Sequence, residues 1–311
     1  MKWIVMGTGG VGGYFGGRLA QAGEEVWFVA RGEYLAALRE GGLRVESVAG
    51  DFTVEPCRAV EDPAEAGEAD AVLVAVKSWQ TEAAARALRP AIGPGTSVVS
   101  LQNGATAAEE IGAVLGMEHM LGGTCRLVAF LAGPGRVTHA AVEPTVAVGE
   151  LDGRRSERAE GIFAAFERCQ GVHPTLSDDI QRDIWTKFVF IASVSGVGAV
   201  TRVSADRSRS VPETRALLVS ALREVEAVAR ARGVDLGGDV VGQTLRFIDA
   251  LPEGATASMQ RDIVAGRPSE LEAQNGAVVH LGRELGVPTP THEFLYAALE
   301  PQEILAREGR P

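Results

Sequence analysis

Apolar and polar residues alternate along the first half of the chain in a pattern typical of strands followed by helices. Each short apolar run is followed by a segment whose apolar residues recur at helical spacing. The predicted strand and helix pairs are residues 3–7 and 11–23, 25–31 and 33–42, 70–78 and 81–92, and 96–104 and 107–116. Because strands and helices alternate, the pattern predicts a parallel sheet with helices on both faces.

The pattern changes twice after Gly122. Shorter strand-like runs come first, at residues 124–133, 135–140 and 145–150, and a helix is predicted near Arg155–Arg168. From about His173 the chain has few strand-like runs, and long helices are predicted at Asp179–Val200, Pro212–Arg232, Gly238–Ala250, Glu270–Leu285 and His292–Arg307. The sequence therefore predicts an α/β fold: a Rossmann-type dinucleotide-binding domain, residues 1–172, followed by a mainly α-helical substrate domain, residues 173–311.

Composition and charge narrow the class of protein. The net charge is −11 and no basic run occurs, which argues against nucleic acid or an anionic membrane as a partner. No uninterrupted apolar stretch reaches about 18 residues, so no transmembrane helix is predicted. The three cysteines, Cys57, Cys125 and Cys169, are scattered and form no metal-binding or disulfide pattern. A cytoplasmic protein without a metal site is expected.

A glycine-rich loop follows the first predicted strand and opens the first predicted helix. A G-x-G-x-x-G pattern in this position is typical of dinucleotide-binding sites. The first glycine allows a tight turn, the second lets a pyrophosphate approach the backbone, and the third allows close packing of helix on strand. The residues predicted to bind the cofactor here are Gly7, Thr8, Gly9, Gly10, Val11 and Gly12.

The end of the second strand indicates which dinucleotide binds. An NAD site would carry an acidic residue there, to bond the ribose 2′-hydroxyl, but this strand ends in Ala30-Arg31. A guanidinium can bind a 2′-phosphate through two hydrogen bonds. NADPH is therefore the predicted cofactor, with Arg31 as its phosphate ligand.

Two further candidates follow predicted strands, at the edge of the sheet where ligands of such folds bind. Lys77 offers a positive charge, and Asn103 an amide donor and acceptor. The chain has only two asparagines, Asn103 and Asn275, and each lies in the tetrapeptide QNGA. Asn103 is either a ligand contact or a turn residue that tolerates positive φ. Asn275 lies on the apolar face of its helix, where a buried structural amide is an equal alternative to a site residue.

Lys187 is one of only three lysines in a chain that otherwise uses arginine. It shares a helical face with Ile184, Ile191 and Ser195, so it either extends out to solvent or is held in a cleft as a general acid. Glu270 begins the helix that contains Asn275, and it is either a first-turn acid that suits the helix dipole or a site residue.

These residues together resemble the ketopantoate reductases, also called 2-dehydropantoate 2-reductases, over nearly the whole chain. The matching segments are GTGGVG at 7–12, Arg31, AVKSWQ at 75–80, QNG at 102–104, IWTKF at 184–188, ASMQRDIVAGRPSELEAQNGA at 257–277 and LGVPTP at 285–290. The resemblance implies NADPH-dependent reduction of 2-dehydropantoate to pantoate, a step of pantothenate and coenzyme A biosynthesis.

The resemblance also implies roles for individual residues. Lys187 corresponds to the proton donor, Asn103 and Ser258 to substrate contacts, and Glu270 to the acid that holds the lysine and the cofactor. One departure bears on the substrate. Where family members carry asparagines that hold the substrate, four and eight residues after the lysine, this chain has Ile191 and Ser195.

The resulting prediction is an NADPH-dependent reductase of a small 2-keto acid, with Lys187 and Glu270 as catalytic residues. Lys77, Asn103 and Glu270 are expected to bind the cofactor as well, and Asn103, Lys187, Ser195 and Ser258 the substrate. Two alternatives stay open: a reductase of another branched 2-keto acid, and a non-catalytic dinucleotide-binding sensor. The sequence does not give the oligomeric state, and a homodimer is one alternative.

Overall fold

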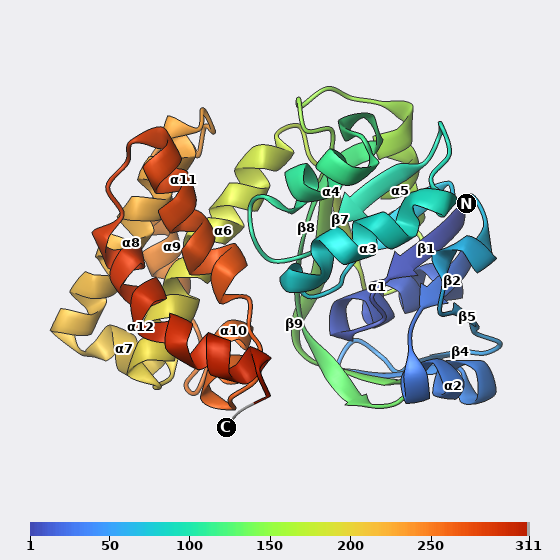
Figure 1. Ribbon diagram of the computed structural model, residues 1–311, viewed down its shortest axis with the longest axis horizontal. Coiled ribbons are helices and arrows are strands. Elements are labelled where there is room, and N and C mark those ends of the chain that lie inside the picture. Colours follow the sequence, from blue (N-terminus) through green and yellow to red (C-terminus); the bar gives the residue numbers. More distant parts are fainter. Residues whose placement is uncertain (310–311) are drawn as a thin grey trace. The chain divides into compact units, whose positions relative to one another are not determined.

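A computed structural model describes residues 1–309 (Figure 1). The chain divides into two compact units. The first unit contains residues Met1–Gln102 and Ala107–Asp183, and the second contains Asn103–Thr106 and the residues from Ile184 onward. The α/β class with a mainly helical second part is confirmed. The division falls after Asp183 rather than after residue 172, because strand β10 (His173–Leu176) pairs with strand β9 (Arg136–Gly149) of the first unit.

The first unit is built on a ten-stranded sheet. Its remaining strands are β1 (Lys2–Met6), β2 (Glu25–Val29), β3 (Leu43–Ser47), β4 (Phe52–Val54), β5 (Arg58–Val60), β6 (Ala71–Val74), β7 (Ser97–Ser100) and β8 (Met120–Gly133). The strand order is β4-β3-β9-β8-β7-β6-β1-β2-β5, and the part from β5 to β8 is parallel. The predicted parallel sheet is therefore present.

Helices cover both faces of this sheet, as the alternation of elements predicts (Figure 1). They are α1 (Gly10–Gln21), α2 (Gly32–Gly41), α3 (Thr81–Leu88), α4 (Ala107–Leu115) and α5 (Glu157–Glu167). Strand β1 shows the two-sided burial directly: Trp3 and Val5 pack into the core with α1 and α5, and Ile4 and Met6 into the core with α3 and α4. Buried strands of this kind read as continuous apolar runs.

The ribbon formed by β8 and β9 differs from the prediction. The runs at 135–140 and 145–150 belong to one strand, β9, which pairs antiparallel with β8. The register of this ribbon shifts near Val128, opposite the segment after Ala141. Val142 has φ 67° there, which is rare for a β-branched residue. The apolar pattern is interrupted at these residues, so the sequence predicts two strands where the structure has one.

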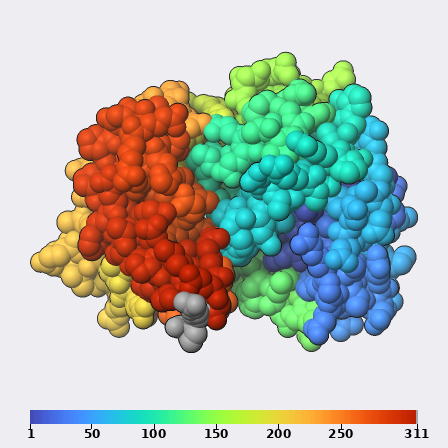
Figure 2. Space-filling view, in the orientation of Figure 1, coloured from blue at the N-terminus to red at the C-terminus, as the bar shows by residue number. Residues whose placement is uncertain are grey.

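The second unit is helical. Its elements are α6 (Ile180–Thr201, which starts before the division), α7 (Ala205–Ser210), α8 (Pro212–Ala231), α9 (Val240–Asp249), α10 (Ser258–Val264), the π-helix η5 (Glu272–Gly276), α11 (Ala277–Leu285) and α12 (Pro290–Arg307). Helix α12 lies at the surface of this unit (Figure 2).

Helix α6 forms the centre of the second unit. It is long and apolar enough to cross a membrane, but 61% of its most apolar window is buried inside the protein. Trp185, Phe188 and Val189 are among its residues in the core cluster with α8 and α11. A helix that is apolar on most sides and buried in this way is a core helix.

Candidate active site

The glycine loop has the close packing that its pattern predicts. Gly7 has φ 100°, and a Cβ atom on it would lie 2.6 Å from the Val76 backbone nitrogen. A Cβ on Gly12 would lie 2.1 Å from the Gly7 carbonyl oxygen. A Cβ on Gly9, in contrast, would have no neighbour within 4 Å. Gly7 and Gly12 are therefore needed for packing, and Gly9 leaves the backbone open to a ligand.

The N-terminus of α1 is suited to an anion. Gly9 is its N-cap residue, no side chain caps the helix, and its first turn has no acidic residue. The Thr8 hydroxyl donates to the Val29 carbonyl oxygen at 3.0 Å, which ties the loop to β2. Gly10 lies against the β8 backbone at Ala129, where a side chain would not fit. Uncapped N–H groups and the helix dipole together favour a phosphate at this point, so these residues fit a dinucleotide pyrophosphate.

Two basic residues follow strands of the same sheet. Arg31 is exposed and is the N-cap residue of α2, and its guanidinium forms no hydrogen bond or ion pair within residues 1–309. Lys77 is exposed too, and its ammonium lies 5.8 Å from the centre of the Trp79 ring. Arg31 is thus available to a ligand phosphate.

Asn103 is hydrogen-bonded to Glu270. The Asn103 Nδ2 atom donates to Glu270 Oε2 at 3.0 Å, and the Glu270 side chain is buried. Gly104 has φ 120°, and a Cβ on it would lie 3.2 Å from the Ala273 carbonyl oxygen. The first QNGA segment therefore contains a glycine turn, and that turn lies against the helix that carries the second QNGA segment.

The first three residues of the second QNGA segment lie in the π-helix η5 rather than in a turn. Asn275 is completely buried, and its Nδ2 atom donates to the Ala192 carbonyl oxygen at 3.2 Å and to His292 Nδ1 at 3.0 Å. His292 Nε2 faces the Ala221 carbonyl oxygen, so Nε2 carries the proton and Nδ1 accepts. Burial lowers the pKa of His292 to about 4. Asn275 thus joins α6 to α12 through a neutral histidine.

The remaining predicted residues lie on α6 and α10. Lys187 is half-buried and forms no ion pair with Glu270 or with any other group of residues 1–309. Ile191, one turn further on, is half-buried. Ser195 is wholly buried, and its hydroxyl has no hydrogen-bond partner in the described part of the chain. Ser258 is half-buried and begins α10. The structure thus brings Asn103 and Glu270 into contact, whereas Lys187 and Glu270 are not in ion-pair contact.

One support of Glu270 was not foreseen from the sequence. Glu303 of α12 is buried and accepts hydrogen bonds from the Ser269 backbone nitrogen and hydroxyl. The Arg307 Nε atom donates to the same carboxylate at 2.7 Å. The residue before Glu270 is therefore held by a side chain far along the chain. Only the serine directly before the acid signalled a capped helix start.

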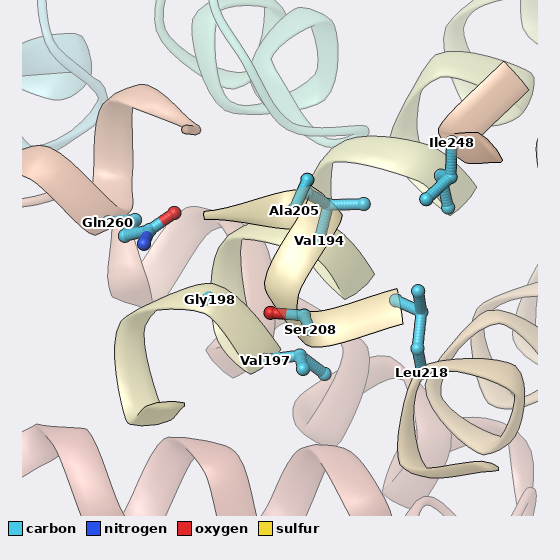
Figure 3. A pocket seen from close by; sticks show the side chains of 8 residues that line it. All are labelled: Val194, Val197, Gly198, Ala205, Ser208, Leu218, Ile248 and Gln260. Carbon is cyan, nitrogen blue, oxygen red and sulfur yellow. The ribbon is translucent and has the colours of Figure 1, made fainter. Parts of the chain in front are cut away.

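The small cavity drawn in Figure 3 is not the substrate site. It lies in the second unit, is lined by Val194, Leu218, Ile248 and neighbouring residues, and has a volume of about 10 Å³. That volume holds about one water molecule. None of the predicted site residues lines it.

Comparison with known proteins decides the family. Residues 3–153 match the family described as Ketopantoate reductase PanE/ApbA, and residues 179–303 match Ketopantoate reductase PanE/ApbA C terminal. The chain belongs to the ketopantoate reductase family. The resemblance drawn from the sequence is thereby confirmed, and the protein is an oxidoreductase with a Rossmann-like first unit.

Relatives of this ketopantoate reductase family member match it over nearly their whole length. A 2-dehydropantoate 2-reductase of Nostoc is 31% identical, with 96% of this chain and 94% of the relative covered. An uncharacterised oxidoreductase of Bacillus subtilis, YkpB, is 27% identical, with 97% and 99% covered. The crystal structure of a PanE/ApbA family ketopantoate reductase from Ralstonia eutropha is 31% identical, covers 99% of this chain and 100% of its own, and has a TM-score of 0.89.

Proposed function

We propose that this protein reduces 2-dehydropantoate to pantoate with NADPH, in the pathway to pantothenate and coenzyme A. The observation that carries the proposal is Lys187, a half-buried lysine on the central helix α6 with no counter-ion among residues 1–309. A half-buried lysine without an acidic partner costs folding free energy if its role is structural, but it can serve as a general acid. Several relatives of similar length, the Nostoc protein among them, carry the name of this reaction.

The cofactor assignment rests on the first unit. The open backbone at Gly9 and the uncapped N-terminus of α1 bind the pyrophosphate. Arg31 binds the 2′-phosphate that distinguishes NADPH from NADH. Lys77 adds positive charge at the same edge of the sheet. When bound, NADPH supplies a hydride from its nicotinamide C4 atom to the ketone carbon.

The chain supplies the proton and the positioning. The Lys187 ammonium stabilises the alkoxide that develops on the substrate oxygen and then transfers a proton from Nζ to it. Asn103 and Ser258 contact the substrate, and Ser195 lies two turns after Lys187 on α6. Glu270 Oε1 accepts no hydrogen bond within residues 1–309, so it is the atom we assign to the lysine or the cofactor. One keto acid, one NADPH and one proton give one 2-hydroxy acid and NADP⁺.

Ile191 supports a second candidate substrate. This half-buried apolar side chain stands one turn from Lys187, where an amide would hold a polar group of the substrate. A different branched 2-keto acid is therefore the alternative substrate. A non-catalytic sensor would need neither Lys187 nor Glu270. No disulfide joins the three cysteines within residues 1–309, which suits the reducing cytoplasm in which we place the reaction.

Initial rates of NADPH oxidation with a panel of branched 2-keto acids test this function. We expect the highest kcat/KM with 2-dehydropantoate, and lower rates when NADH replaces NADPH. A higher kcat/KM with another keto acid would move the assignment to that substrate. Absence of turnover with every keto acid, in a protein that still binds NADPH, would favour the sensor.

A further inference from the structure

Gln274 is a buried amide of which only one end has a partner. The side chain is completely buried and lies in the π-helix η5, one turn after Glu270. Its Nε2 atom faces Glu270 Oε2 at 3.5 Å, and its Oε1 atom has no hydrogen-bond partner within residues 1–309. Buried polar atoms nearly always have hydrogen-bond partners, so the unpaired carbonyl oxygen of Gln274 needs an explanation.

The orientation of the amide follows from chemistry. An ionised carboxylate only accepts hydrogen bonds, so the amide must turn its NH₂ group toward Glu270 and its oxygen away. Turning the amide over would place two oxygens against each other. Gln274 Oε1 is therefore the end of the amide without a partner, and it presents an acceptor.

Glu270 and Gln274 together offer unused acceptors. Glu270 Oε2 accepts hydrogen bonds from the side-chain amides of both Asn103 and Gln274. Glu270 Oε1 accepts no hydrogen bond within residues 1–309. Two spare acceptor atoms thus stand one turn apart beside Asn103, which is only half-buried. π-Helical turns of this kind are frequent at functional sites. A leucine or methionine at position 274 would avoid the cost of an unpaired buried carbonyl.

Because Glu270 Oε1 is assigned to the lysine or the cofactor, Gln274 Oε1 is the acceptor that still lacks a donor. The carboxylate and ketone of a 2-keto acid are acceptors too, so a substrate that bonds this atom does so through a donor elsewhere on the molecule. We propose that Gln274 Oε1 recognises a hydroxyl group on the side chain of the keto acid. This inference rests on the proposed function, and it assigns Gln274 as a residue that selects hydroxylated substrates over their deoxy counterparts.

A matched pair of substrates tests the assignment. Trimethylpyruvate is 2-dehydropantoate without its hydroxyl group, so the two differ only in the proposed donor. In Gln274→Met, kcat/KM for 2-dehydropantoate should fall about ten- to a hundredfold, the range expected for an unpaired buried polar group. The value for trimethylpyruvate should change less than about threefold. The NADPH dissociation constant, measured by titration, should not change.

The melting temperature separates recognition from packing. Gln274→Met should melt at or above the wild-type temperature, because the substitution removes an unpaired buried oxygen and keeps an unbranched side chain. Gln274→Leu provides a second variant should the first fold poorly. Asn275→Ala, which alters the neighbouring amide of the same π-helix, is the control: it should lower the melting temperature and leave the ratio of the two kcat/KM values unchanged.

An equal loss for both substrates, an unchanged kcat/KM for 2-dehydropantoate, or a loss of NADPH affinity would each overturn the assignment of Gln274. Failure of the proposed function looks different. In that case wild-type protein would turn over neither keto acid.

Discussion

The Asn103 amide donates to the Glu270 carboxylate at 3.0 Å, across 167 positions of the chain. This contact brings the first QNGA segment against the helix of the second. The two asparagines nevertheless have different surroundings. Asn103 is half-buried and holds a carboxylate, while Asn275 is completely buried and holds a backbone carbonyl and a histidine.

The two asparagines should therefore respond differently to truncation. Asn103→Ala removes a donor from Glu270 and should lower kcat/KM by about ten- to a hundredfold, the scale of a hydrogen bond to a charged group, with little change in melting temperature. Asn275→Ala should do the reverse and cost about 2 kcal/mol of unfolding free energy, because His292 Nδ1 loses its donor. Steady-state kinetics and thermal melts of both variants check this. Loss of stability alone in both would make both segments structural.

The glycine loop offers a pair of neighbouring substitutions with opposite effects. Gly12→Ala forces a methyl group against the Gly7 carbonyl oxygen and should cost about 1–3 kcal/mol of stability. Gly9→Ala meets no atom and has φ −84°, so the melting temperature should not change. Its methyl group stands where the pyrophosphate approaches, and NADPH affinity should drop about tenfold or more, equivalent to about 1.4 kcal/mol. Unchanged NADPH affinity in Gly9→Ala would remove the phosphate site from this loop.

Arg31 should discriminate between the two dinucleotides. Arg31→Ala should weaken NADPH binding by about 1.5–3 kcal/mol, the range of a charge-assisted hydrogen bond, and hardly affect NADH. Titration of both cofactors into the variant gives the two dissociation constants. Equal losses for NADPH and NADH would contradict the 2′-phosphate assignment.

His292 should make stability depend on pH. Burial lowers its pKa from 6.5 to about 4 in the folded protein, so the unfolded chain takes up the proton first as the pH falls. The contribution is therefore complete above pH 6.5 and is lost progressively down to about pH 4, by about 3 kcal/mol in total. His292→Asn, which keeps an amide donor and acceptor without a titrating group, should show a smaller decline in denaturant unfolding over that range. An identical decline in the variant would place the effect elsewhere.

Much of the fold was predictable because burial determines the pattern. Strand β1 is buried on both faces, so it reads as one apolar run before the glycine loop. Strand β10 (His173–Leu176), by contrast, is short and alternates between exposed and half-buried residues, so it has no apolar run in the sequence. It is a strand because it pairs with β9. Because that pairing leaves no signal in the sequence, the sequence predicts a domain boundary before this strand, after residue 172.

Candidate site residues could be named from the sequence where one residue type carries the chemistry, as with Gly9 and Arg31, and their roles stay predictions. A contact was not predictable where a partner lies far along the chain. In the sequence, Glu303 looks like an ordinary charged residue of a surface helix. The fold shows that it accepts a hydrogen bond from Ser269. Gln274 falls at ordinary helical spacing, and periodicity does not reveal the wider π-helical turn that contains it.

The proposed reaction depends most on Lys187, and single-turnover hydride transfer in Lys187→Arg and Lys187→Ala tests its role most directly. Arginine keeps the charge but does not release a proton near neutral pH. Lys187→Arg should therefore bind 2-dehydropantoate and NADPH yet react about 10²–10⁴-fold more slowly, and Lys187→Ala should be slower still because the developing alkoxide loses its counter-charge. Wild-type rates in Lys187→Arg would contradict the role of Lys187 as proton donor, because the proton would then come from another group.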